Sequence, residues 1–439
     1  MPVLTLDAVK DHFSSNPDYV YQRVHIGGEV ISVTGLKSLI NFPQSLHLLR
    51  EPLLAHETFS TEQFIGLGQP LLPANTDTII NEILDGMLIA LHDASGECIR
   101  IIPVPQPLSR QVSTPLTENN VRGSSSAFNE DIDTNVGLLR KHLNTSNLKI
   151  DHYSCGSIVK NTVMLCYLQQ TIDPVLLRTI TETLESQLET EVSNLRELSK
   201  LFKFSNLSFV SRYLATELPQ MAARALKDGK AVIFIERIPF AIILPSLISD
   251  MFMTEDDLNH PPVFTILLRS LRIIGALMTL IAPGLYVAIV SVNPDVLRYE
   301  LAHTIAISRL DVPYPAIIEA LLLLLILELI MEAIIRLPSS IGPTVTMVGG
   351  IVLGEAVVQA KLVSSLLIIV LAAVTISNAT VVGFQNSYSI RLFKYLLLFL
   401  SALFGVTGML SGIIIVCAYL SGVTTLGVPY LQLKQPKGE

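Results

Sequence analysis

The chain has 439 residues and a mean hydropathy of +0.52, and half of its residues are hydrophobic, which is high for a soluble protein. Its charge is uneven, because residues 263–439 carry ten Lys or Arg and eight Asp or Glu, whereas residues 1–262 carry twenty and thirty. An acidic front half therefore precedes an apolar back half. The lack of a basic run argues against a nucleic-acid partner.

The N-terminal stretch MPVLTLDAVKDHF has neither the basic nor the apolar region of a cleavable signal peptide, so we expect the front half to lie in the cytoplasm. The four cysteines are scattered without a CxxC spacing, which predicts free thiols. No Walker A, GxSxG or HExxH pattern occurs. The sequence therefore predicts no enzyme, no metal site and no cofactor.

The front half mixes helical and strand patterns. In chain order, they predict a helix at 7–13, a strand at 19–26, a hairpin of 86–93 with 97–104, a loop over about 109–135, a strand at 162–168, a helix at 173–202 and a hairpin at 230–245. Asp173 as the N-cap and Pro174 at the first helical position mark the start of the long helix. We predict a mixed α/β (α+β) soluble region over residues 1–255.

The back half is dominated by long runs without charge. Four such runs occur, at 273–294, 337–354, 362–390 and 395–433. A membrane-spanning helix needs about 20 apolar residues, so the first, third and fourth runs qualify easily and the second is at the lower limit. The segment 315–335 is a fifth candidate. We predict a multi-span helical membrane bundle with four or five spans over 256–430, followed by a short polar tail over 431–439.

Three glutamates interrupt the fifth candidate. Its thirteen Leu and Ile residues favour insertion by about 4 to 8 kcal/mol, and three ionised carboxylates at about 2.5 to 3.5 kcal/mol each nearly cancel that gain. Glu328, Glu332 and Arg336 share one helix face at i, i+4 and i+8. Glu319 lies on the opposite face, near the helix start, where a carboxylate suits the helix dipole. The face either lines a bundle interior, a subunit interface or a water-filled path, or it only pairs structurally with Arg336.

Two further features of the back half concern polar pairing and helix packing. Glu355 and Gln359 form a second i, i+4 polar pair, which either joins the same path or marks the interfacial end of a short span. Two Gly-x-x-x-Gly spacings predict close approach between helices. These are Gly350 with Gly354 and Gly408 with Gly412.

Two stretches carry motifs in combination. Residues 109–143 follow the pattern R-x-[VI]-x-x-P-x-x-E-x-x-[VI]-x-G-x-x-x-x-F-x-E and then TN-x-x-L-[IL]-R. Residues 311–364 contain V-P-[FY]-P, then E-x-x-x-E-A-x-x-R-[LM]-P-x-x-I-G from Glu328 onward, and a glycine-rich stretch. Together they resemble the A-subunit family of spore germination receptors, the GerA-type proteins, which include members similar to stage V sporulation protein AF.

In the first motif, several residues are candidates for holding the loop against its own domain or a neighbouring subunit, although a solvated loop is the alternative. They are Arg110, Glu118, Arg122, Gly123, Glu130, Asn135 and Arg140. The resemblance implies a multi-pass protein of the spore inner membrane that forms oligomers in contact with membrane lipid. It also implies two partners, a transporter-like B subunit that binds nutrients and a lipoprotein C subunit.

The sequence leaves two functions open. One is a membrane subunit of a germinant receptor that forms or gates an oligomeric ion channel during spore germination. The other is a non-conducting oligomeric scaffold that couples a nutrient-binding partner to downstream germination machinery. A secondary transporter is disfavoured because the spans show no inverted repeat, and an enzyme because no nucleophile, base or metal set assembles.

Overall fold

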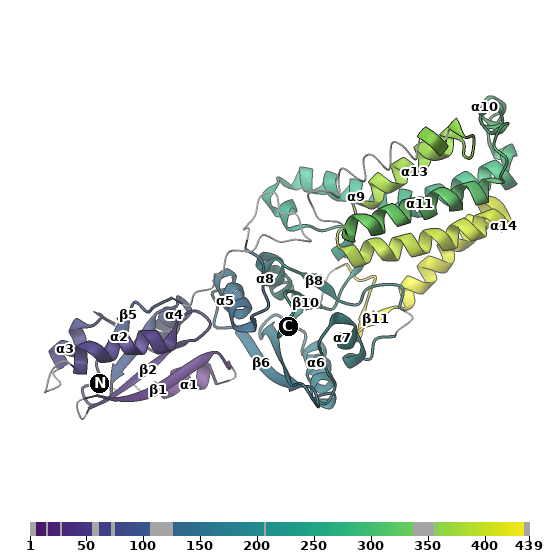
Figure 1. Ribbon diagram of the computed structural model, residues 1–439. Coiled ribbons are helices and arrows are strands. Elements are labelled where there is room, and N and C mark those ends of the chain that lie inside the picture. Colours follow the sequence, from purple (N-terminus) through teal and green to yellow (C-terminus); the bar gives the residue numbers. More distant parts are fainter. Residues whose placement is uncertain are drawn as a thin grey trace.

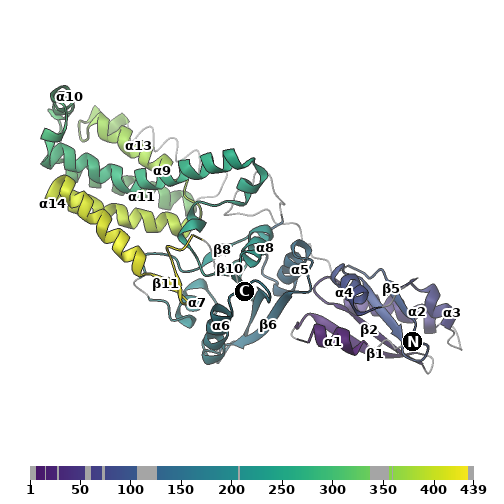
Figure 2. The same cartoon turned by 180° about the vertical axis from the view of Figure 1, so that it is seen from behind.

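The computed structural model describes residues 6–14, 16–26, 29–54, 61–71, 75–105, 126–205, 208–336, 355–357 and 359–433. These residues form two α+β units, each built on an antiparallel sheet, followed by a helical region (Figure 1). Seen from the front and from behind, the second unit lies between the first unit and the helices (Figures 1 and 2). The structure therefore confirms an α+β region followed by an α-helical region.

The first unit has a five-stranded sheet in the order β1-β2-β4-β5-β3. Its strands are β1 (Tyr19–Ile26), β2 (Glu29–Leu36), β3 (Gln69–Pro70), β4 (Leu88–His92) and β5 (Cys98–Ile101). Its helices are α1 (Asp7–His12), α2 (Phe42–Leu54), α3 (Thr61–Gly66) and α4 (Thr76–Leu84). The predicted first strand and the β4–β5 hairpin are confirmed, with Leu88 opposite Ile101 in the hairpin.

The second unit has a five-stranded sheet in the order β6-β7-β9-β10-β8 with helices on both faces. Its strands are β6 (Leu148–Cys155), β7 (Asn161–Leu168), β8 (Leu214–Thr216), β9 (Ala231–Ile235) and β10 (Ala241–Leu244). Its helices are α5 (Ile132–His142), α6 (Pro174–Ser186), α7 (Leu195–Leu201) and α8 (Pro219–Lys227). Because α6 and α7 cover one face and α5 and α8 the other, β9 is buried along its whole length, which explains its unbroken apolar sequence.

The long helix predicted at 173–202 is two helices. Its start is confirmed, since the Asp173 carboxylate accepts a hydrogen bond from the backbone N–H of Val175 at 2.9 Å. The helix ends at Ser186, however, and α7 begins after Asn194, whose side chain caps it. The connection places Val192 in the core, fully buried. The cap formed by Asn194 and the burial of Val192 favour a break in the helix. They outweigh the helical propensity of the glutamates that lie between α6 and α7.

The helical region follows two short 3₁₀ turns, η1 (Ile248–Met251) and η2 (Glu255–Asn259). Its helices are α9 (Pro262–Val287), α10 (Tyr299–Arg309), α11 (Ala316–Arg336), α13 (Ser365–Asn378) and α14 (Phe384–Gly422). Between α9 and α10 lie a π-helical turn, η3 (Ala288–Val292), and a 3₁₀ turn, η4 (Pro294–Val296). Among the described residues, two helical stretches are long and apolar enough to cross a membrane, at 262–292 and 385–422.

The helix α14 is bent back on itself at Gly405. This glycine has φ 64° and ψ −140°, which is not helical. Phe393, before the bend, lies 5.8 Å from Tyr419, after it, measured between ring centroids. Such a contact across 26 positions requires two antiparallel arms, which Figure 1 also shows. The uncharged run at 395–433 is therefore divided between two arms and a returning tail.

The end of the chain packs on the second unit rather than continuing the helices. A two-residue ribbon joins β11 (Thr424–Thr425) to β12 (Val428–Pro429). Val428 belongs to the apolar core beneath the second sheet, and Tyr430 is only 1% exposed. The backbone N–H of Ile248 donates to the carbonyl oxygen of Tyr430 at 2.9 Å. Residues that the sequence places in the membrane bundle therefore stabilise the front region.

Candidate functional site

A cluster of charges joins α11 to the first arm of α14. The Glu328 carboxylate accepts hydrogen bonds from Arg391 at 2.5 Å, from Lys394 at 3.3 Å and from the Tyr395 hydroxyl at 3.3 Å. The side chains of Arg391 and Lys394 are 10% and 5% exposed. A carboxylate among apolar helices is costly unless it is paired. Glu328 is therefore satisfied within the chain, in a cluster with one excess positive charge.

A second polar cluster lies at the opposite end of α11. Glu319 is fully buried, accepts a hydrogen bond from the backbone N–H of Ser364 and lies 3.3 Å from Arg309. Ser364 is the N-cap of α13 and also shares a hydrogen bond of 2.8 Å with the Tyr286 hydroxyl. The sequence places Glu319 at the start of its own helix, but its carboxylate also reaches the N-terminus of α13, where negative charge is favoured. It thereby joins α9, α10, α11 and α13.

The remaining predicted polar residues are exposed. Glu332 accepts from Arg336 at 2.6 Å, with side chains 51% and 77% exposed. Glu355 accepts from Gln359 at 3.0 Å, also on the surface. Both i, i+4 pairs form as their spacing predicts, whereas Glu328 turns to α14 instead of Arg336. The structure thus separates the predicted polar face into one half-buried, paired carboxylate and one exposed pair.

A third cluster lies where the second unit meets α9. The Asp257 carboxylate accepts hydrogen bonds from Arg272 at 2.8 Å, from Arg269 at 3.2 Å and from Thr254. Burial alone would raise the pKa of Asp257, but the hydrogen bonds from Arg272 and Thr254 outweigh it and lower the pKa to about 2. This carboxylate stays ionised and ties the turn η2 to α9.

The described part of the first motif holds the two α+β units together. Arg140, on α5, forms two hydrogen bonds with Asp18 of the first unit, at 2.6 and 2.8 Å, and both side chains are 2% exposed. The Asn135 amide bonds the backbone of Asn129 twice, and the carbonyl oxygen of Glu130 accepts from Arg237. These residues shape the start of α5. Arg110, Glu118, Arg122 and Gly123 lie outside the described residues.

The glycine pair on α14 brings the two arms of the hairpin together. A Cβ at Gly408 would lie 2.0 Å from the carbonyl oxygen of Leu400, and one at Gly412 would lie 3.1 Å from the side chain of Leu397. The close approach therefore occurs between arms of one bent helix. Gly350 and Gly354 lie outside the described residues.

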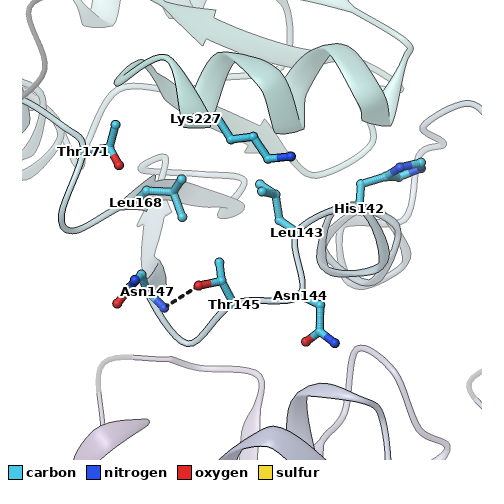
Figure 3. A pocket seen from close by; sticks show the side chains of 8 residues that line it. All are labelled: His142, Leu143, Asn144, Thr145, Asn147, Leu168, Thr171 and Lys227. Atoms are coloured by element: carbon cyan, nitrogen blue, oxygen red, sulfur yellow. Dashed lines mark hydrogen bonds between the residues drawn. The ribbon is translucent and has the colours of Figure 1, made fainter.

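A pocket of about 380 Å³ opens beside α5 and α8 in the second unit, and Figure 3 shows the side chains that line it. Its two basic side chains, His142 and Lys227, are the last residues of α5 and α8. Burial lowers the pKa of His142, and Lys227 lowers it further. Basic side chains are favoured at helix C-termini, so the positions of His142 and Lys227 at the ends of their helices explain why both are basic. Asn144 in its lining instead contacts the first unit, through Asp85 at 2.5 Å.

The model of the Bacillus/Clostridium GerA spore germination protein family matches residues 7–438. The chain belongs to this family. It is similar to the spore germination protein GerLA of Bacillus cereus, with 32% identity over 369 residues, which cover 84% of this chain and 75% of the relative. It is also similar to YfkQ, an uncharacterized membrane protein of Bacillus subtilis (strain 168), with 28% identity over 425 residues, covering 94% and 82%.

Among solved structures, the crystal structure of the N-terminal domain of the A subunit of the Bacillus megaterium spore germinant receptor GerK3 matches 55% of this chain and 93% of its own. The identity is 18% and the TM-score 0.41. This GerA protein is a membrane protein whose described residues include two candidate spans. Its family is one of spore germination proteins and not a known enzyme family.

Sequence reasoning missed the partners of the paired carboxylates Glu328 and Asp18 in this GerA protein. Arg391 and Lys394 are the only charged residues between Lys361 and Lys434. Lone cations in an apolar segment need a carboxylate, and the nearest candidates in an apolar helix are those of α11. A comparison of the charged residues in α11 and in α14 could therefore have predicted that Arg391 and Lys394 pair with Glu328. No comparable signal pointed to Asp18, which lies 122 positions from its partner.

Proposed function

We propose that this GerA protein is the A subunit of a spore germinant receptor and that it forms or gates an oligomeric ion-conducting complex. It would lie in the spore inner membrane with residues 1–255 in the cytoplasm. Its partners would be a transporter-like B subunit that binds the nutrient, a lipoprotein C subunit and further copies of itself. Membership of the family and the apolar helices support this assignment.

The observation that carries ion conduction is the exposed face of α11. Along this face lie Ile318, Leu325 and Leu329, followed by Glu332 and Arg336, all of them exposed. Their spacing of 7, 4, 3 and 4 positions places them on one side of the helix. In a symmetric oligomer, leucines would form an apolar constriction and Glu332 a ring of carboxylates beside it. Both are devices by which channels gate and select ions.

Liposomes that contain the purified protein test this function directly. Glu332→Gln keeps the side-chain volume while removing the charge, so assembly is retained and cation flux, or the preference for cations over anions, falls. Glu300→Gln, on exposed α10, removes the same charge away from the α11 face and serves as the matched control. Equal flux and selectivity in well-assembled Glu332→Gln and wild-type protein would show that Glu332 does not line the ion path.

The second candidate function, a non-conducting scaffold, is favoured by two carboxylates that are paired within the chain. Glu328 and Glu319 are both paired with cations of the same chain, so neither is free to compensate a passing ion. In a scaffold, the charge clusters would only fix the helices relative to one another. Absence of flux above protein-free liposomes, from a preparation that still forms oligomers, would favour this function.

The motif around residues 109–143 would serve assembly. Its described residues connect the two units through Arg140, and a rigid pair of units is a suitable base for contacts between subunits. Gly123→Val should lower the yield of oligomer at unchanged monomer stability. Wild-type oligomer yield in that variant would show that the loop is only solvated.

A further inference from the structure

A groove of about 470 Å³ lies between the second unit and the start of α14. It is bounded by α7, by the described residues 208–213 and by the first three turns of α14. Its lining is basic and rich in hydroxyls, and no acidic residue is among the described residues that form it. The lining residues on which the argument rests are Arg196, Phe204, Phe209, Arg212, Gln385 and Tyr388.

The groove is held in shape from both arms of the α14 hairpin. Ser211 shares a hydrogen bond of 2.5 Å with Gln385 at the start of the first arm. The backbone N–H of Phe209 donates to the Tyr419 hydroxyl near the end of the second arm, at 2.9 Å. The Phe209 ring also lies 6.4 Å from that of Phe393. The groove is therefore a preformed part of the junction.

Its two arginines have no carboxylate partner among the described residues. Arg212 lies over the Phe204 ring at 5.6 Å and donates only long hydrogen bonds, to Ser208 at 3.4 Å and to the carbonyl oxygen of Thr424 at 3.3 Å. Arg196 is on the exposed side of α7. Elsewhere at this junction, arginines are engaged by Asp257. Guanidinium groups of this kind match the oxygens of a phosphate.

An exposed apolar track leaves the groove along α14. Tyr388, Leu392, Leu396, Phe399 and Leu403 are all exposed and follow one another at intervals of four, four, three and four positions. This spacing places them on one side of the first arm, from the groove to the bend. The track runs along one of the two helical stretches that are long and apolar enough to cross a membrane. A ligand that uses both features has an anionic head and a long apolar tail.

We propose that this groove is a binding site for an anionic phospholipid. Its phosphate would lie between Arg212 and Arg196, and an acyl chain would follow the track along α14. Basic pockets beside membrane helices are suited to such headgroups. Because the groove joins α7 to both arms of the hairpin, a bound lipid would link the second unit to the membrane helices. Nothing in this site depends on whether the protein conducts ions.

Binding can be measured on the purified full-length chain in neutral detergent, by native mass spectrometry and by thermal unfolding during titration with phosphatidylglycerol. Phosphatidylglycerol should bind more tightly than phosphatidylcholine and raise the midpoint of unfolding. Arg212→Ala should weaken phosphatidylglycerol binding about tenfold, as expected when a charge-assisted hydrogen bond is lost. Arg178→Ala, an exposed arginine of α6 outside the groove, is the matched control and should bind as wild type does.

A second variant keeps the test decisive if Arg212→Ala unfolds, since Arg212 packs on Phe204. Arg196→Glu changes only an exposed position and should also weaken binding of phosphatidylglycerol. Wild-type affinity in folded Arg196→Glu and Arg212→Ala proteins, or equal affinity for the two lipids, would overturn the proposal. Inorganic phosphate provides the last arm. If it stabilises the protein as much as phosphatidylglycerol does and competes with it, the groove binds a free anion and not a lipid.

Discussion

The two α+β units and the helical region differ in which large apolar side chains they expose and in how many charges they bury among apolar elements. The sheets enclose Val, Ile and Leu at close to zero exposure and leave most charges outside. The helices expose large apolar residues such as Ile266, Leu271 and Ile274, and they bury Glu319, Arg391 and Lys394. The difference teaches that the α+β units are folded for water and the helical region for lipid. In the helical region, polar groups specify the packing, because apolar contacts with lipid and with protein are nearly equivalent.

Each region nevertheless contains a close ion pair that joins segments far apart in sequence, fully buried in the front region and half-buried among the helices. In the front region it is Asp18 with Arg140, and in the helices Glu328 with Arg391. Removing one partner of such a pair leaves a charge without compensation, which costs far more than the intact pair contributes. The following changes test how far the two regions obey the same rules.

Gly405→Ala should have the largest effect. A Cβ there would lie 1.8 Å from the side-chain oxygen of Asn293, and the φ of 64° with ψ of −140° is strained for any residue with a side chain. The hairpin could not close, so the yield of folded protein should collapse. Size-exclusion chromatography of detergent extracts measures this. Gly422→Ala, where nothing lies within 4 Å, is the control and should be tolerated.

Arg140→Met should destabilise the front region by about 3–5 kcal/mol, because Asp18 would remain charged and buried. Lys37→Met removes a cation from the same interface, but its pair with Asp133 is 39% exposed on each side, so we expect a loss of about 0–1 kcal/mol. Thermal unfolding of the full chain compares the two. Adding Asp18→Leu to Arg140→Met should restore much of the loss. Equal effects of Arg140→Met and Lys37→Met would contradict this account.

Glu319→Gln tests the same rule among the helices. The amide can still accept from Ser364, but it loses the attraction of Arg309 and of the α13 N-terminus, so we expect a loss of about 1–3 kcal/mol. The exposed Glu355→Gln, also on a helix, should cost less than about 0.5 kcal/mol. Retention of oligomer on heating in detergent ranks the two. A larger loss in Glu355→Gln would mean that exposure does not govern these carboxylates.

The sequence alone reveals much of the fold, because local patterns determine it. Alternation predicts β1 and the β4–β5 hairpin, and Asp173 with Pro174 marks the start of α6. Hydropathy separates the two regions because a stretch that is apolar on every side differs from an amphipathic helix.

What the sequence does not reveal are contacts between distant positions. The bend at Gly405 has no local signal beyond one glycine in an apolar run, since its geometry depends on Asn293 and on the facing arm. Glu328 is expected to avoid lipid, and its pairing with Arg391 rather than Arg336 depends on how α11 packs on α14. Exposure, too, is a property of packing, so the division between Glu328 and Glu332 could not be predicted from a shared helix face.

Asp257 lies where the front region meets the helices. Because this contact depends on the charge of Asp257, its contribution to stability depends on pH. The folded pKa of about 2 lies below the ordinary value of 3.8. A group whose pKa is lowered by folding contributes stability that is fully present above 3.8 and is lost as the pH falls toward 2. Asp257→Asn removes this contribution at neutral pH, since the amide cannot attract Arg269 and Arg272 as a carboxylate does.

The difference in unfolding midpoint between wild type and Asp257→Asn should therefore be constant from neutral pH down to about 4 and shrink between about 4 and 2. Asp256→Asn, the neighbouring carboxylate, is the control for general acid effects. A difference that persists undiminished at the acid end would mean that Asp257 acts through the shape of its hydrogen bonds alone. A difference that shrinks as expected would show that its charge, held by two arginines of α9, joins the front region to the helices.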